Sequence, residues 1–291
     1  FVWGPVGAMK DGVSGYYNDF SLLMRMKSRL KYIINKWQIR HYPLSNKAMR
    51  KASLVLAATS EVRDFIRRWH RDDVVLMNET GCYALPEGLP AERDDQCMSM
   101  IWVGKFDPRK QLQIAIRTLA CLRNKHDNVC LHIVGAGTPD QQHRARQLAD
   151  KLGCSGSIIW HGKVPNTQVH NLMRQSSVLL FTSIDEGTPH VVLEAVQNHL
   201  PVICFDTCGQ RDIVTEDTGV KIPLTNPDDS VRRFTRAISQ LIDNPAILRQ
   251  KRRNCSNCQP ELLWDEKARR MVALYEQCLE KEQCDNMPHH N

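Results

Sequence analysis

The chain has 291 residues, more than a typical single domain, and its length predicts two domains or a domain and a half. Apolar residues make up 42% and charged residues 24%, as in soluble globular proteins, and the net charge is +7. No segment holds 18 uninterrupted apolar residues, so no membrane-spanning helix is expected. The start, FVWGPVGAMK, lacks the features of a secretory signal, and FVW is typical of the end of a buried strand. We therefore expect a cytoplasmic protein whose chain begins inside a domain.

The 11 cysteines are odd in number and irregularly spaced, which argues against a disulfide framework and favours buried, reduced thiols. The alternative is a zinc site built from CSNC (255–258) with Cys278, Cys284, His289 and His290. These residues lack the spacing of the common zinc modules, so no metal site is expected.

The first element in chain order is a basic helix at 20–40. Between Phe20 and Ser60 there are nine Lys or Arg and no Asp or Glu, and apolar residues recur at helical spacing. One interpretation is peripheral contact with an anionic membrane, at its inner face; the other is an ordinary helix packed on its sheet with a solvated basic face. Binding to nucleic acid is not expected, because no binding motif accompanies the charge.

Short apolar runs then alternate with amphipathic helices. Before Ser99 the sequence predicts strands at 55–59 and 74–79, a helix at 61–69 and a polar linker, ALPEGLPAERDDQ (84–96). After it we expect strands at 100–104, 129–135, 157–162, 177–183, 201–206 and 219–223, and helices at 110–124, 140–152, 166–175, 189–198, near Asp212, and at 227–243. A final helix is expected at 260–282.

This alternation predicts an α/β fold with parallel sheets covered on both faces. We expect a partial N-terminal Rossmann-like domain at 1–97, with the linker at about 84–97, and a complete Rossmann-like domain at 98–258. Residues 259–291 would form a helix that packs back on the first domain, followed by a tail.

Ligands of open parallel sheets bind at the carboxyl ends of the strands, so these ends are the candidate site. In the second domain they are GKFDPRK (104–110), GAG (135–137), HGKVP (161–165), SIDEGTPH (183–190) and DTCGQ (206–210). Glycine recurs at these ends and would let a ligand approach the backbone closely. The first end supplies three cations, and the fourth supplies a carboxylate and a helix start.

The stretch DEGTPHVVLEA (185–195) carries two glutamates around that helix start. Thr188 is a candidate N-cap and Pro189 a candidate first helical residue, where free N–H groups favour a phosphate. Glu186 precedes the helix and Glu194 lies on its second turn, so they would reach different parts of one extended ligand, such as a nucleotide sugar. The alternative is a solvated Glu186 and a Glu194 that pairs with a basic neighbour, since this spacing is common by chance.

The stretch EGTPHVVLE matches the E-x7-E motif of retaining, nucleotide-sugar-dependent glycosyltransferases of family 4 (group 1), which have the GT-B fold of two Rossmann-like domains. VGKFDPRK, LHIVGAG, WHGKVP, PVICFDTCGQRDIV and TGVKIP resemble the family in the same order and spacing. The resemblance is strong over about 98–225 and looser over 1–97. It implies that the second domain is complete and the first partial.

The resemblance implies roles for individual residues. Glu186 would contact hydroxyls of the donor sugar, Lys105 and Lys110 the diphosphate with help from Arg109, and Glu194 the ribose. The remaining donor-binding positions would be Gly187, Thr188, Pro189 and His190 at the sugar and phosphate, Gly162, Lys163 and Val164 at the base, and Gly135 and Gly137 at the neighbouring strand end. Two features depart from the family: Lys105 stands where Arg is usual, and the Gly-rich loop of the N-terminal domain is absent.

The expected function is transfer of a sugar from a UDP-, GDP- or ADP-linked donor to a hydroxyl of a glycan or lipid-linked acceptor, with retention and without a cofactor. No D-x-D occurs in the chain, so no metal is expected at the diphosphate. One alternative is an incomplete fragment that only binds the nucleotide or nucleotide sugar. Another is a GT-B epimerase or phosphorylase, for which the chain shows no cofactor-binding Lys.

Overall fold

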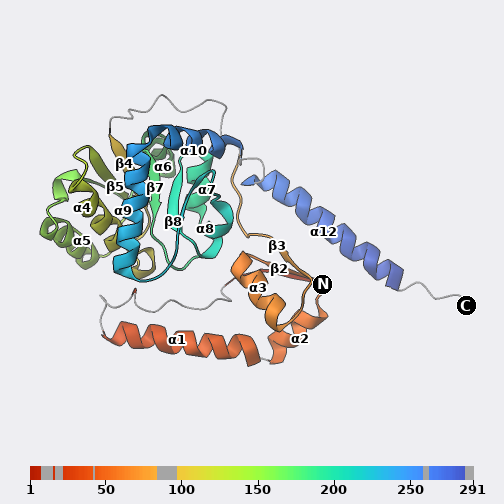
Figure 1. The fold of residues 1–291 in the computed structure, drawn as a ribbon. Helices are drawn as coiled ribbons and strands as arrows, with labels where there is room; N and C mark the ends of the chain where they lie inside the picture. Colours follow the sequence, from red (N-terminus) through yellow and green to blue (C-terminus); the bar gives the residue numbers. More distant parts are fainter. Residues whose placement is uncertain (8–15, 17–21, 42, 84–96, 258–261, 286–291) are drawn as a thin grey trace, which may run out of the picture.

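The computed structural model describes residues 1–7, 16, 22–41, 43–83, 97–257 and 262–285 (Figure 1). Two parallel sheets organise the chain: three strands in the order β1-β2-β3, and six in the order β6-β5-β4-β7-β8-β9. The α/β class with parallel sheets is confirmed. The predicted linker 84–96 lies outside the described residues. No helix in the described ranges combines the length and apolarity that crossing a membrane requires.

The smaller sheet and its helices are called the N-terminal unit here. It contains β1 (Val2–Val6), α1 (Leu22–His41), α2 (Pro43–Lys51), β2 (Leu54–Ala57), α3 (Ser60–Trp69), β3 (Val74–Leu76) and α12 (Trp264–Asp285). Successive residues of β2 point to opposite faces, as the strand period of two requires. Val55 and Ala57 pack with residues of α2 and α3, whereas Leu54 and Leu56 pack with Met271 and neighbouring residues of α12.

Backbone hydrogen bonds tie α12 to this unit. The Cys82 amide donates to the Leu262 carbonyl at 2.9 Å, and the Trp264 amide donates to the Cys82 carbonyl at 3.0 Å. Lys267 donates to Asn78, and burial lowers the pKa of its ammonium group to about 8. The last helix of the chain therefore completes the second face of the first sheet.

The larger sheet and its helices are called the C-terminal unit. Its strands are β4 (Met98–Val103), β5 (Val129–Val134), β6 (Ile158–Gly162), β7 (Val178–Phe181), β8 (Val202–Phe205) and β9 (Gly219–Ile222). Its helices are α4 (Leu112–Arg123), α5 (Pro139–Lys151), α6 (Asn166–Gln175), α7 (His190–Gln197), α8 (Cys208–Ile213), α9 (Pro227–Asp243) and α10 (Pro245–Asn257), with short 3-10 turns at Pro108–Lys110 and Ser155–Ser157.

The two faces of this sheet carry separate cores. Residues of α4, α5 and α9 pack on one face, and residues of α6, α7 and α8 on the other; α10 contributes Leu248 to the first core and Cys255 to the second. In chain order the strands run 3-2-1-4-5-6, the doubly wound arrangement in which the strand order reverses between the first and fourth strands. Those strands are β4 and β7, and in sheets with this strand order ligands bind outside the carboxyl ends of the two strands at the reversal.

Two local predictions differ from the structure. Helix α7 begins at His190, with Pro189 at the N-cap position and no side-chain cap, so Thr188 does not cap it. Helix α10 was not predicted, because only Leu248 and Cys255 of its 13 residues are buried and its apolar stripe is too thin to give a helical period.

Gly135, directly after β5, shows why glycine is needed at one strand end. Its φ is +128°, and a Cβ there would lie 1.8 Å from the Gly104 carbonyl oxygen. Its amide donates to the Gly162 carbonyl at 2.7 Å. The ends of β4, β5 and β6 therefore approach one another through backbone alone.

We predict that Gly135→Ala lowers the free energy of unfolding by about 3 kcal/mol or more, because it adds a backbone clash to a strained φ. Gly156→Ala is the matched control, since Gly156 has open space around its Cβ position, and it should change stability by less than about 1 kcal/mol. Urea unfolding measures both variants. Equal effects of the two substitutions would contradict the strand-end geometry.

Candidate functional site

Hydrogen bonds around Thr182 join the loops at the carboxyl ends of β4 and β7. The Trp102 indole N–H donates to the Thr182 hydroxyl at 3.1 Å, and that hydroxyl donates to the Lys110 carbonyl at 2.7 Å. The Ile184 amide donates to the Arg109 carbonyl at 2.9 Å. The loops after β4 and β7 are therefore fixed side by side.

Lys110 and Glu186 meet across these loops. Lys110 Nζ lies 2.6 Å from Glu186 Oε1, with side chains only 17% and 14% exposed. The ammonium also lies 5.2 Å from the centre of the Phe181 ring, and the Ser183 hydroxyl donates to Glu186 Oε1. Two residues 76 positions apart, both singled out in the sequence, thus form one half-buried ion pair.

The other two cations of this loop differ in their contacts. Lys105 is exposed, and Arg109 donates to Asp107 Oδ1 at 3.1 Å and to the Asp185 carbonyl at 3.4 Å. Burial would raise the pKa of Asp107, but hydrogen bonds from the Arg109 amide and guanidinium outweigh it and the pKa is lowered. Arg109 therefore ties its own loop to the loop after β7.

The segment that leads into α7 lies against the start of α8. The Gly209 amide donates to the Gly187 carbonyl at 3.0 Å, and the Glu186 amide donates to Cys208 Sγ at 3.4 Å. Thr188 and Pro189 are buried and His190 is exposed. Within the described ranges the buried Thr188 Oγ1 has no hydrogen-bond partner, which leaves a polar atom of this segment available to a ligand.

Glu194 lies on the far side of the same helix start. Its Oε1 accepts a hydrogen bond from Asn166 Nδ2 at 3.1 Å, which brings it next to the start of α6. Asn166 follows the segment with Gly162, exposed Lys163 and half-buried Val164. Gly137, near the end of β5, packs against Gln141 and Phe106, where a Cβ would lie 2.5 Å from Gln141 Oε1. The two glutamates therefore contact different strand-end loops.

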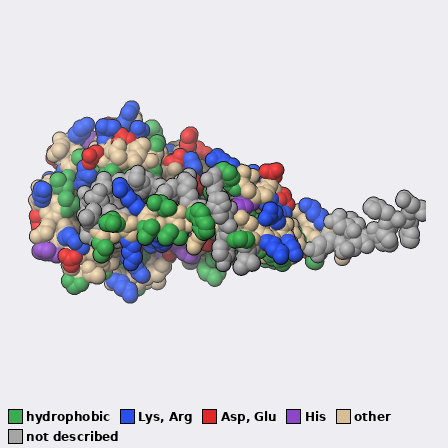
Figure 2. Space-filling view, turned by 90° about the horizontal axis from the view of Figure 1, so that it is seen from below, with side chains coloured by type: hydrophobic (Ala, Val, Ile, Leu, Met, Phe, Trp, Pro, Cys, Tyr) green, Lys and Arg blue, Asp and Glu red, His purple; other side chains and the backbone are tan. Residues whose placement is uncertain are grey.

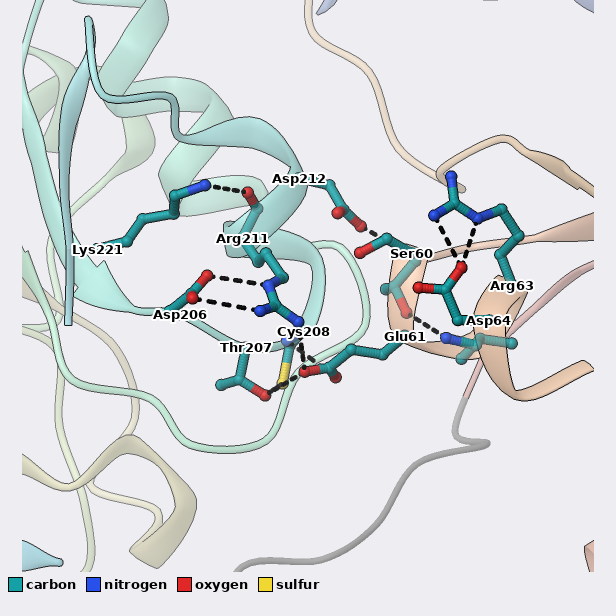
Figure 3. Close-up of polar contacts among 12 residues, drawn as sticks. Ser60, Glu61, Arg63, Asp64, Asp206, Thr207, Cys208, Arg211, Asp212 and Lys221 are labelled. Atoms are coloured by element: carbon teal, nitrogen blue, oxygen red, sulfur yellow. Dashed lines mark hydrogen bonds and ion pairs between the residues drawn. The ribbon is translucent and has the colours of Figure 1, made fainter. Parts of the chain in front are cut away.

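Two carboxylates of the N-terminal unit also reach this edge, and sequence reasoning missed both. Glu61, in the first turn of α3, accepts from the Thr207 hydroxyl at 2.9 Å and the Cys208 amide at 3.1 Å (Figure 3). Glu79, three residues beyond β3, accepts from the Thr188 amide at 3.3 Å. Glu79 could have been found by applying the strand-end rule to the first sheet as well.

The contact at Glu61 is reciprocal. Asp212 of α8 accepts from the Ser60 amide at 2.7 Å, so each helix start donates to an acidic side chain of the other helix (Figure 3). Arg211 lies 3.8 Å from Glu61 and 2.9 Å from Asp206. The two sheets therefore face each other with their candidate-site edges in contact.

Within the described residues, no group of three or more His, Cys, Asp or Glu could hold a metal ion. The alternative zinc cluster falls largely outside them: Cys258, His289 and His290 are not described, nor is the side chain of Cys284.

Comparison with known proteins identifies the family. The family described as "Glycosyl transferases group 1" matches residues 92–258, more than half of the chain. Lipopolysaccharide 1,6-galactosyltransferase of Salmonella typhimurium is 28% identical over 229 residues, covering 74% of this chain and 61% of that protein. Putative glycosyltransferase EpsD of Bacillus subtilis is 29% identical over 152 residues, covering 52% of this chain and 38% of that protein.

Solved structures share the fold. The lipopolysaccharide outer core galactosyltransferase WaaB, in its apo form, has a TM-score of 0.64 at 22% identity and covers 78% of this chain and 62% of that one. The pneumococcal O-GlcNAc transferase GtfA, in complex with UDP and GlcNAc, has a TM-score of 0.66 at 18% identity and covers 82% and 48%. These neighbours are GT-B glycosyltransferases, and the predicted fold class is confirmed.

The chain spans 38% to 61% of the length of the two curated relatives. On the strength of the family match, which includes every strand of the larger sheet, the chain belongs to the group 1 glycosyl transferases.

Proposed function

We propose that this chain transfers a glycosyl group from a nucleotide-sugar donor to a hydroxyl of a glycan or lipid-linked acceptor. The observation that carries the proposal is the Lys110–Glu186 pair, 2.6 Å apart, at the carboxyl ends of β4 and β7 and shortly before the start of α7. We also propose the division into domains at 1–97 and 98–258, with 259–291 returning to the first. The two separate sheets support this division.

The charges suit a reaction in which the anomeric C–O bond breaks. Negative charge then develops on the leaving diphosphate, and Lys110, Lys105 and the amide groups at the start of α7 would stabilise it. In the structure, Glu186 is the ion-pair partner of Lys110. We infer that the diphosphate replaces Glu186 as the partner of Lys110 and that the Glu186 oxygens then accept hydrogen bonds from hydroxyls of the sugar.

The remaining donor would lie along the strand ends. Glu194 would accept from the ribose hydroxyls, and the segment Gly162–Val164 beside Asn166 would hold the base, with Gly135 and Gly137 leaving room at the backbone. Relatives solved with UDP support a nucleoside diphosphate as the common part of the donor. UDP-, GDP- and ADP-sugars all fit the proposal.

We further propose retention of configuration without a metal. The family resemblance favours same-face transfer. The bond between the anomeric carbon and the diphosphate oxygen breaks, the acceptor oxygen bonds to that carbon on the same face, and the leaving diphosphate takes the proton of the acceptor hydroxyl. Lys110 and Lys105 supply the positive charge that a bridging metal would otherwise supply, and the chain has no D-x-D. A second candidate function is donor binding without transfer, favoured by the partial coverage of the relatives.

We expect Glu194→Ala to weaken nucleoside diphosphate binding by about tenfold, because it removes an acceptor for two hydroxyls. Lys110→Ala should slow release of the nucleoside diphosphate from the nucleotide sugar by about 100-fold, because the leaving charge loses its cation. Titration calorimetry with UDP, GDP and ADP, and a release assay with their sugars, measure these effects.

Glu276→Ala, an exposed position on α12, is the control and should leave both quantities unchanged. Unchanged donor affinity in both site variants would refute the site assignment. Donor binding with no release or transfer in the unmodified chain would favour the second candidate function.

We further propose that α1 makes a peripheral contact with a membrane surface. Every described side chain of α1 is exposed, and Leu23, Met26, Leu30, Ile33, Ile34 and Trp37 are 43% to 78% exposed. Figure 2 shows hydrophobic side chains gathered on the face seen from below, where α1 lies. Lys27, Arg29 and Lys31 are exposed beside them, and α1 contains no acidic residue. This combination of an apolar face and positive charge complements an anionic lipid surface.

The double variant Lys27→Gln, Lys31→Gln should bind phosphatidylglycerol vesicles at least about tenfold more weakly, since each surface cation contributes about 1 kcal/mol. The control is Lys125→Gln, Lys151→Gln, which removes exposed lysines of the C-terminal unit. Co-sedimentation measures binding, with phosphatidylcholine vesicles for comparison. Equal binding by both double variants would contradict the proposal, as would self-association of the chain, seen by light scattering, without vesicle binding.

A further inference from the structure

Glu79 places a second carboxylate at the loop that precedes α7. It comes from the carboxyl end of β3 in the N-terminal unit, whereas the loop belongs to the C-terminal unit. Its Oε1 accepts from the Thr188 amide at 3.3 Å and lies 2.4 Å from the position that a Cβ of residue 187 would occupy. Two carboxylates from different units therefore lie next to Gly187. Glu186 precedes it in the sequence, and the fold brings Glu79 beside it.

Glu79 can accept further hydrogen bonds at this position. The residue is exposed, and within the described part of the chain its Oε2 makes no hydrogen bond. An ionised carboxylate only accepts hydrogen bonds, so its natural partners are N–H and O–H donors. A phosphate offers neither and would be repelled, whereas a sugar ring presents several hydroxyls.

Structural contacts between the two units are supplied elsewhere. Glu61, Ser60 and Asp212 form reciprocal hydrogen bonds between α3 and α8 (Figure 3). The contact of Glu79 is longer, single, and directed at the segment assigned to the donor sugar. Its placement is therefore better suited to a ligand than to holding the units together.

We propose that Glu79 is a specificity-determining residue of the donor site, which accepts hydrogen bonds from hydroxyls of the transferred sugar. The inference rests on the proposed function and adds the substrate class: a neutral hexose rather than a uronic acid. A sugar carboxylate near Glu79 and Glu186 would meet like charge, whereas hydroxyls would meet acceptors. Because Glu79 comes from the other sheet, recognition of the sugar requires the two units to be in contact.

The experiment separates binding of the sugar from binding of the nucleotide. Calorimetry on the whole chain measures the affinities of UDP, UDP-glucose and UDP-galactose, and of GDP and GDP-mannose, for the unmodified protein, Glu79→Gln and Glu61→Gln. The preferred hexose nucleotide should bind the unmodified protein more tightly than its free nucleoside diphosphate. Glu79→Gln should reduce this advantage at least fivefold and change affinity for the free nucleoside diphosphate by less than twofold.

Glu61→Gln is the matched control, because it alters a carboxylate that joins the units through Thr207 and Cys208. It should affect the nucleotide and its sugar conjugate equally. A retained sugar advantage in Glu79→Gln would overturn the inference while leaving the proposed function intact. The inference would also be overturned if Glu79→Gln strengthened binding of the free nucleoside diphosphate and of its hexose conjugate equally. Glu79 would then act only by repelling the phosphate groups.

The uronic acid donor gives an independent readout. UDP-glucuronate, or GDP-mannuronate if guanine is preferred, should bind the unmodified protein at least tenfold more weakly than the neutral counterpart, and Glu79→Gln should narrow this gap. A gap that Glu79→Gln leaves unchanged would contradict the charge argument. Failure of the unmodified protein to bind any of these nucleotides would refute the proposed function, and this inference with it.

Discussion

The adjacency of β4 and β7 is the constraint on which the candidate site depends. Backbone pairing of Met100 with Val178 and of Ile101 with Leu179 sets this adjacency. The buried Thr182 hydroxyl extends it to the following loops, because it accepts from the Trp102 indole and donates to the Lys110 carbonyl. Because this hydrogen bond holds the backbone of Lys110, the Lys110 side chain lies next to Glu186 on the neighbouring loop. Gly135 then allows the backbones at the ends of β4 and β5 to approach each other closely.

The second constraint is the way in which the two units meet. Short helices begin with amide groups that lack partners, and a buried start must find acceptors. Here α3 and α8 supply acceptors to each other through Asp212 and Glu61. This pairing brings the carboxyl end of β3, and with it Glu79, to the loop before α7. The N-terminal unit thus contributes carboxylates to an edge where the C-terminal unit contributes cations.

Much of this could be predicted from the sequence, for physical reasons. Buried parallel strands form continuous apolar runs, so the pattern of apolar runs in the sequence predicts the positions of all six strands in the larger sheet. The rule that ligands bind at the carboxyl ends of the strands predicts one candidate site containing Lys110 and Glu186, whose charged groups lie 2.6 Å apart in the structure. Helix α7 was expected one residue early, because Thr-Pro is a strong start signal and Thr188 is instead buried without capping.

The strand order, the contact between α3 and α8 and the position of Glu79 could not be predicted from the sequence, because they depend on the three-dimensional fold. The strand order, which places β4 beside β7, depends on crossover connections that leave no local signal. The reciprocal contact of α3 with α8 joins residues about 150 positions apart, and neither Glu61 nor Asp212 differs in sequence from an ordinary helical acid. The three-residue strand β3 ends before Met77, so the pattern VVLMNE hid Glu79 within an expected strand.

The half-buried ion pair also bears on which ligands the site can accept. Removing water from Lys110 and Glu186 has a cost that their mutual attraction offsets, and separating them without replacement would leave two poorly solvated charges. A neutral nucleoside offers no anion for Lys110. A free diphosphate satisfies Lys110 but leaves Glu186 beside additional negative charge. A ligand that joins a diphosphate to a hydroxyl-rich ring supplies partners for both, and such a ligand is the donor that the proposed function requires.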